Sequence, residues 1–116
     1  MKYVINNDFG GFSLSEAAML RYAELKGFTL YEKRDEYGRV SFYTDLYRKE
    51  YFSDDSIKRS DPALVQAVEE LGDKADGDCA HLVVIDIPKG ERFVLREYDG
   101  NEHVELEKEI KWEVAT

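Results

Sequence analysis

A Gly-Gly pair flanked by phenylalanines is the first feature that could do chemistry. An apolar strand-like run precedes it, and a serine-rich helix start follows. Glycines permit backbone angles that other residues resist, and the first turn of a helix has N–H groups without intrahelical partners, which suit an anion. The same pattern also suits a tight turn whose phenylalanines pack in the core. The ligand-binding residues predicted in this loop are Asn6, Phe9, Gly10, Gly11, Phe12 and Ser13.

A second candidate lies at Arg59-Ser60-Asp61-Pro62. A serine or aspartate before a proline is typical of a helix start. A guanidinium next to that start would match a phosphate or carboxylate, and the alternative is a solvated arginine beside a purely structural cap. We predict Arg59, Ser60 and Asp61 as ligand-binding residues, and Arg96 in a later strand as a further cation.

Catalytic and metal chemistry have little support in the sequence. The two histidines, His81 and His103, and the single cysteine, Cys79, show no paired metal-ligand spacing. The serines near the Gly-Gly pair lack a nucleophile-elbow pattern. We therefore predict no catalytic residue, no metal and no cofactor. Cys79 is expected to be an inert packing residue, and a chain with one cysteine suits the reducing cytoplasm.

The net charge favours some classes of partner over others. The net charge is −9, from 25 acidic and 16 basic residues, which disfavours direct binding to nucleic acid. It permits an acidic surface that mimics nucleic acid, with an acidic row at Glu105, Glu107, Glu109 and Glu113. The chain has no apolar run of the roughly 20 residues that span a membrane and no secretory-signal layout at its start. We expect no membrane partner.

Local patterns predict one domain over residues 1–116, with the order β-α-β-β-α-β-β-β. A helix begins at Ser13 or Ser15, where Ser13 and Glu16 match a capping box, and ends at Gly27. A second helix runs from Pro62 to Gly72. Residues 45–59 are expected to form a loop. The predicted strands cover residues 2–6, 28–33, 39–44, 81–88, 91–97 and 103–114.

The last predicted strand has the clearest alternation, with apolar residues at Val104, Leu106, Ile110, Trp112 and Val114. Hairpin connections between most strands indicate an α+β fold, with a mixed or antiparallel sheet and both helices on one face. Exposed aromatics at residues 42–43, 47 and 51–52 suit a homodimer face, or they pack under the neighbouring loop.

Three blocks together resemble a group of small proteins encoded by tailed phages and prophages. These are Val4-Ile5-Asn6 with Phe9-Gly10-Gly11-Phe12-Ser13-Leu14-Ser15, then Arg59-Ser60-Asp61-Pro62-Ala63-Leu64-Val65 running to Val68-Glu69-Glu70-Leu71-Gly72, and finally Val83–Pro88 leading to Glu97-Tyr98-Asp99-Gly100-Asn101-Glu102. The resemblance implies an accessory protein that acts in the cytoplasm of an infected bacterial cell, where it sequesters a nucleotide signal or binds a host protein.

Three functions follow from these observations. The first is binding of a small anionic, nucleotide-like ligand without catalysis, as a way to sequester a host-defence signal. The alternative is an acidic protein-interaction module that inhibits a host protein, in the extreme case as a nucleic-acid mimic. The third is a small enzyme that processes nucleotides.

Overall fold

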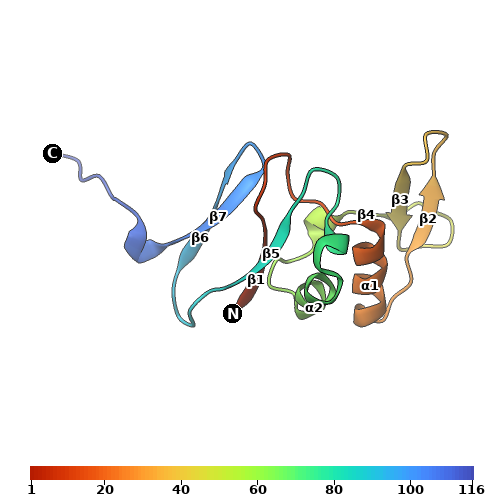
Figure 1. The fold of residues 1–116 in the computed structure, drawn as a ribbon, viewed down its shortest axis with the longest axis horizontal. Helices are drawn as coiled ribbons and strands as arrows, with labels where there is room; N and C mark the ends of the chain where they lie inside the picture. Colours follow the sequence, from red (N-terminus) through yellow and green to blue (C-terminus); the bar gives the residue numbers. More distant parts are fainter.

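Three small antiparallel sheets and two helices lie in a row along the long axis of the molecule (Figure 1). The computed structural model describes residues 1–116 and measures 58 × 28 × 26 Å. The helices are α1 (Glu16–Lys26) and α2 (Pro62–Leu71), with short 3-10 turns at Asp54–Ser56, Gly72–Ala75 and Glu107–Glu109. The strands are β1 (Lys2–Asn6), β2 (Tyr31–Arg34), β3 (Val40–Tyr43), β4 (Tyr51–Phe52), β5 (Leu82–Asp86), β6 (Phe93–Tyr98) and β7 (Asn101–Leu106).

The ends of the helices are fixed by capping residues in the sequence. Ser15, rather than Ser13, caps α1 by accepting the Ala18 N–H at 3.1 Å. Gly27 ends α1 at φ +85°, a left-handed conformation that glycine adopts without strain. Asp61 caps α2 and Pro62 occupies its first turn. These contacts fix where each helix enters the core.

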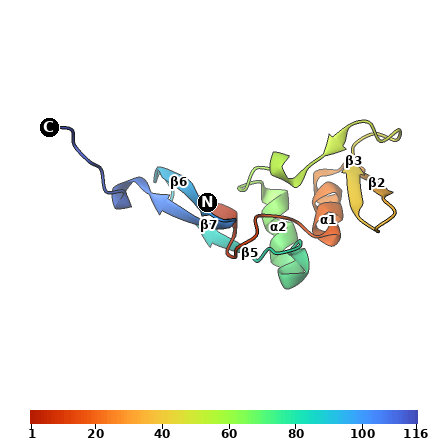
Figure 2. The same cartoon turned by 90° about the horizontal axis from the view of Figure 1, so that it is seen from above.

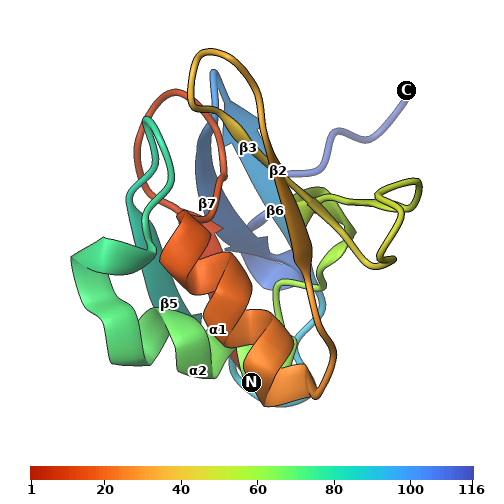
Figure 3. The same cartoon turned by 90° about the vertical axis from the view of Figure 1, so that its right-hand side faces the viewer.

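The two helices lie between sheets rather than together on one face of a sheet. Helix α2 packs against the β1–β5 sheet, and α1 packs against α2 (Figures 1 and 3). On its other side α1 meets the β2–β3–β4 sheet, where Tyr22 stacks on Phe52 with ring centroids 6.3 Å apart. The end of α1 lies beside the start of α2, where Lys26 pairs with Asp61.

The α+β class and the antiparallel pairing of the strands are confirmed. The single sheet implied by the order of the elements is divided into β1–β5, β2–β3–β4 and β6–β7. Buried side chains such as Val4, Leu64 and Phe42 fill the layers between the first two sheets and the helices. Each helix therefore has neighbouring elements on two sides, whereas the sequence predicts both helices on one face of a sheet.

The β6–β7 hairpin projects from the rest of the molecule and carries the C-terminal segment at its far end (Figures 1 and 2). Asp99 at φ +50° and Gly100 at φ +88° form its two-residue turn, as Asp-Gly predicts. Strand β7 ends at Leu106, which corrects the predicted strand over 103–114. A 3-10 turn follows, and residues 110–116 have no regular structure.

Candidate functional site

Arg59 is the centre of a buried junction that joins three distant parts of the chain. Its guanidinium donates two hydrogen bonds to the Glu102 carboxylate, at 2.6 and 2.8 Å, and a third to the Val4 carbonyl at 3.2 Å. It also lies 3.6 Å from the centre of the Phe12 ring. The Glu102 side chain is only 7% exposed. The cation predicted to bind an anion is therefore already neutralised by the protein.

Asn6 supports the same junction from β1. Its buried side-chain amide donates to the carbonyls of Asp8 and Gly100, each at 2.8 Å, and its side-chain oxygen accepts the His81 N–H. Its backbone N–H donates to Glu102. The side-chain amide thus has partners on both sides, and Asn6 positions the Gly-Gly loop and the hairpin turn.

The Gly-Gly loop is packed closely against its neighbours at Gly10, whereas a Cβ added to Gly11 would meet no other atom. Gly10 donates its N–H to the Asp99 carbonyl. A Cβ added to Gly10 would lie 2.5 Å from the Cβ of Cys79, and one added to Gly100 would clash with the backbone nitrogens of Gly10 and Gly11. The tight-turn interpretation describes these contacts better than a ligand cradle. Cys79 itself is exposed, contrary to the prediction of a packing residue.

The two helix starts do not converge, and protein groups occupy both of them. Ser15 donates its N–H to the Ala75 carbonyl, and the neighbouring Leu14 N–H binds the Asp54 carboxylate at 3.0 Å. At α2, the Asp61 carboxylate accepts the Ala63 N–H. The first turn of α1 is capped by the Ser15 hydroxyl, which accepts the Ala18 N–H, and the start of α2 by an aspartate, so each already has an acceptor from the chain itself.

Asp61 also accepts the hydroxyl of Tyr22 at 2.8 Å. Burial tends to raise the pKa of Asp61, but hydrogen bonds from Tyr22, the Ala63 N–H and Lys26 outweigh it and hold that pKa below its ordinary value. Burial and then this hydrogen bond raise the pKa of Tyr22 to about 12. The group is a structural network between α1 and α2.

The remaining predicted residues are dispersed. Arg96, on β6, pairs with Glu105 across the hairpin at 2.8 Å. Phe9 is half exposed, and the Ser13 hydroxyl donates to the Asp78 carbonyl. Ser60 borders a shallow hollow of about 400 Å³ beside Tyr3 and residues 55–59. The structure therefore gathers Asn6, Gly10, Gly11, Phe12 and Arg59, and leaves Asp61 and Arg96 elsewhere.

A larger cleft, of about 550 Å³, lies between the β2–β3–β4 sheet, the start of α1 and the loop before β5. We call it the aromatic cleft. Leu14, Met19 and Phe42, which are almost fully buried, form its floor. Tyr37 and Tyr51 border it and are 79% and 66% exposed. A cleft edged by exposed tyrosines is typical of a binding site.

The charge of the aromatic cleft is strongly unbalanced. Its one cation, Arg39, forms no ion pair, whereas four carboxylates line it. Glu16 pairs with Arg34 at 3.1 Å, but the other three have no lysine or arginine partner. These three are Asp54, Asp76 and Asp78. The aromatic cleft therefore offers negative charge to an occupant.

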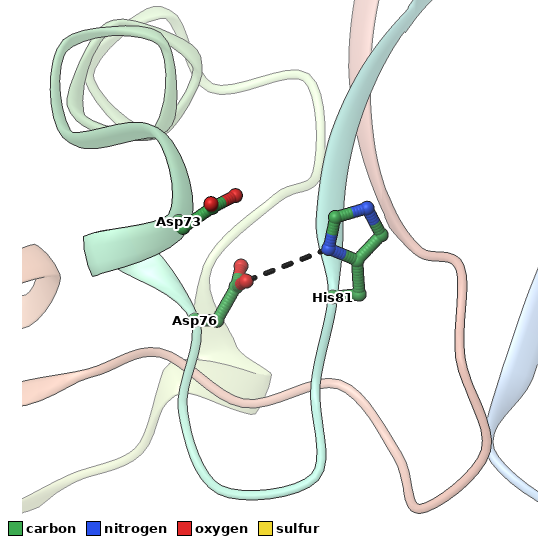
Figure 4. Close-up of side chains that lie close together, drawn as sticks. All are labelled: Asp73, Asp76 and His81. Atoms are coloured by element: carbon green, nitrogen blue, oxygen red, sulfur yellow. Dashed lines mark ion pairs between the residues drawn. The ribbon is translucent and has the colours of Figure 1, made fainter.

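Beside the aromatic cleft, Asp73, Asp76 and His81 turn their side chains toward one another (Figure 4). Their nearest ligand atoms all lie within 4.8 Å of each other, and His81 Nδ1 is 3.6 Å from Asp76 Oδ2. The other oxygen of Asp76 accepts the Leu82 N–H. A divalent cation could use these atoms, but the group is mostly exposed, and such acidic groups are common without an ion.

Sequence reasoning missed the aromatic cleft because its walls come from four separate parts of the chain. The sequence of the aromatic segment around 42–52 predicts only a dimer face or packing under the neighbouring loop. Within it Phe42 is buried and Tyr43 pairs with Tyr51, while Tyr47 is 81% exposed. The acidic stretches at 54–55 and 76–78 are local signals, but their approach to this hairpin depends on how α1 packs.

Neither α1 nor α2 has the length and apolar composition that a membrane-spanning helix requires. Comparisons of the chain with protein-family models, with curated proteins and with solved structures find no match.

Proposed function

We propose that this protein is an acidic protein-interaction module whose aromatic cleft takes a basic, partly apolar segment of a partner protein. The observation that carries the proposal is the charge of the aromatic cleft. Three carboxylates without a lysine or arginine partner, Asp54, Asp76 and Asp78, lie around a floor of buried apolar side chains. A cationic side chain of the partner would pair with these carboxylates, while its apolar neighbours pack against the exposed rings of Tyr37 and Tyr51.

The surroundings of the aromatic cleft favour a peptide over a small cation. Exposed tyrosines continue the surface beyond it, at Tyr37, Tyr47 and Tyr51. Tyrosine gives a large contact area at a low cost in side-chain entropy and is enriched at protein interfaces. A partner segment that crosses this surface would cover both the carboxylates and the tyrosines.

Titration of a labelled peptide rich in arginine and leucine tests the proposal, with fluorescence anisotropy as the readout. We expect saturable binding that weakens as salt is added, because exposed charges are screened. A peptide with glutamate in place of arginine should not bind. Asp78→Asn should weaken binding about two- to fivefold, as for the loss of one exposed ion pair.

Glu24→Gln is the matched control, because Glu24 is an exposed carboxylate on α1 whose partner Arg21 keeps its second ion pair with Glu70. It removes the same charge outside the aromatic cleft and should leave affinity unchanged. Equal losses for Asp78→Asn and Glu24→Gln would mean that only the overall charge matters. No saturable binding of the basic peptide would refute the proposal.

A second candidate function is binding of a small anionic ligand at the hollow beside Ser60. It is favoured by Lys58, which borders this hollow and forms no ion pair. Thermal-shift measurements with mono-, di- and cyclic nucleotides test it, since a ligand that binds only the folded state raises the unfolding temperature. The shift should be lost in Lys58→Ala, and recovery of a converted nucleotide would indicate an enzyme instead.

The phage setting implied by the sequence resemblance is a further proposal, and neither binding experiment depends on it. Under that proposal the basic segment belongs to a host protein that the module inhibits. Binding of the basic peptide would be compatible with either origin.

A further inference from the structure

The C-terminal segment has the sequence of a β-strand without a strand to pair with. Ile110, Trp112 and Val114 alternate with Lys111 and Glu113, which is the period of a strand with one apolar face. In the structure residues 110–116 are irregular, and Trp112 and Val114 are 71% and 85% exposed. A single strand has no stability in water until its backbone and its apolar face find a partner.

Strand β6 has a free edge that matches such a segment. It pairs only with β7. The Glu107 N–H donates to the Arg92 carbonyl. From Arg92 on, every second residue of β6 directs its backbone groups at β7. Val94, Arg96 and Tyr98 accordingly direct their backbone groups at β7, and Phe93, Leu95 and Glu97 direct theirs to the free edge. The β6 face with Val94 and Tyr98 is also exposed, at 39% and 78%.

We propose that residues 110–114 of one chain add an antiparallel strand to the free edge of β6 in a second copy, and that the second copy returns the same contact. In one register of this pairing, the outward backbone groups of β6 bond to the added strand, and the exposed apolar side chains of the two strands cover each other. It places Trp112 opposite Arg96, where ring and guanidinium attract, and Val114 opposite Val94. On the other face Lys111 lies opposite Glu97, an opposite-charge pair.

The chain cannot make this contact with itself. The register puts Ile110 beside Tyr98, at the hairpin turn, whereas β7 delivers the segment to the opposite end of β6, where Leu106 pairs with Phe93. Phe93 and Tyr98 are separated by roughly 17 Å of strand. The 3-10 turn at Glu107–Glu109 spans only about 6 Å. A parallel return along β6 would need a crossover of about a dozen residues. The occupant is therefore a second copy, in a reciprocal two-fold dimer.

Sedimentation velocity of the full chain over a range of concentrations tests the proposal. We expect a dimer, and Trp112→Ala should weaken its association by about tenfold or more, as for a buried aromatic anchor. Lys111→Glu should also weaken it, and Lys111→Glu combined with Glu97→Lys should restore it. Because residues 110–116 lie outside the core, these C-terminal variants should keep the thermal unfolding of the monomer.

Tyr47→Ala is the matched control, since Tyr47 is an equally exposed aromatic at the opposite end of the molecule, on the dimer face suggested by the sequence. It should leave the dimer intact. A full chain that stays monomeric at every concentration would overturn the proposal. So would a dimer that resists Trp112→Ala and removal of residues 110–116, or one that Tyr47→Ala dissociates.

Discussion

The Arg59 junction and the aromatic cleft both contain carboxylates, but only the carboxylate at the junction has an arginine partner. At the junction, Arg59 has Glu102, and Asn6 has donors and acceptors on both sides. In the cleft, Asp54, Asp76 and Asp78 have no lysine or arginine partner. A buried polar group must be satisfied within the fold, whereas a charge at the surface is free to meet a partner. The Arg59 junction has the more distinctive sequence of the two regions, and its role is structural.

The contrast extends to every element predicted to hold an anion. Arg96 pairs with Glu105, the Asp61 carboxylate caps α2, and the Ser15 hydroxyl caps α1. The chain supplies its own hydrogen-bond acceptors at these positions. Its excess of acidic residues is then available in the aromatic cleft, where the occupant we propose is positively charged.

The largest effect is expected at the junction. Glu102→Ala would leave the Arg59 guanidinium largely buried without its carboxylate, at a cost of about 3–5 kcal/mol in the free energy of unfolding. Urea denaturation measures the loss. Replacing both residues with apolar ones should recover part of the stability, because no buried charge remains but the Asn6 N–H loses its acceptor. A loss below about 1 kcal/mol for Glu102→Ala would contradict the view that this pair holds the hairpin to the body.

A smaller effect is expected in alkaline solution at the Tyr22–Asp61 contact. The folded chain raises the pKa of Tyr22 from 10.0 to about 12. The associated stability is therefore complete below pH 10 and is lost as the pH rises to about 12, in total about 2–3 kcal/mol. Denaturant midpoints of the wild type and Tyr22→Phe across this range provide the measurement. The difference between them should narrow with pH, and a constant difference would contradict the assignment.

Two glycines outside the Gly-Gly loop, with nearly the same φ, test how tightly that loop is packed. Gly100 and Gly90 have φ values of +88° and +86°, but only Gly100 faces other atoms, the backbone of Gly10 and Gly11. Gly90→Ala should cost about 1 kcal/mol from backbone strain alone. Gly100→Ala should cost clearly more, because the loop must also move. Equal losses by thermal or urea unfolding would mean that the loop adapts and is not tightly packed.

The smallest effect concerns the single cation of the aromatic cleft. Removing it with Arg39→Ala should strengthen binding of the basic peptide, by about two- to fivefold, since one repulsive charge is lost at an exposed site. Anisotropy titration measures the change, and Lys33→Ala, on the neighbouring exposed strand β2, is the charge-matched control. Weaker binding in Arg39→Ala would indicate that Arg39 contacts the peptide directly.

The sequence by itself determined the local elements and their ends. The Asp99-Gly100 turn, the stop at Gly27 and the Asp61-Pro62 helix start all appear as predicted, because each depends on contacts within a few residues. The α+β class followed from their order. The alternation beyond Leu106 was also visible, but a strand requires a neighbour as well as a pattern.

Only the tertiary structure decided which charges are paired and which are open. Arg59 and Glu102 are 43 residues apart, and nothing local shows that they meet. The walls of the aromatic cleft likewise come from residues 14–19, 37–42, 51–54 and 76–78. Pairing and enclosure depend on long-range packing, which a local pattern does not encode. The sequence therefore predicts a binding site at the Gly-Gly loop, while the structure places carboxylates without a lysine or arginine partner in the aromatic cleft.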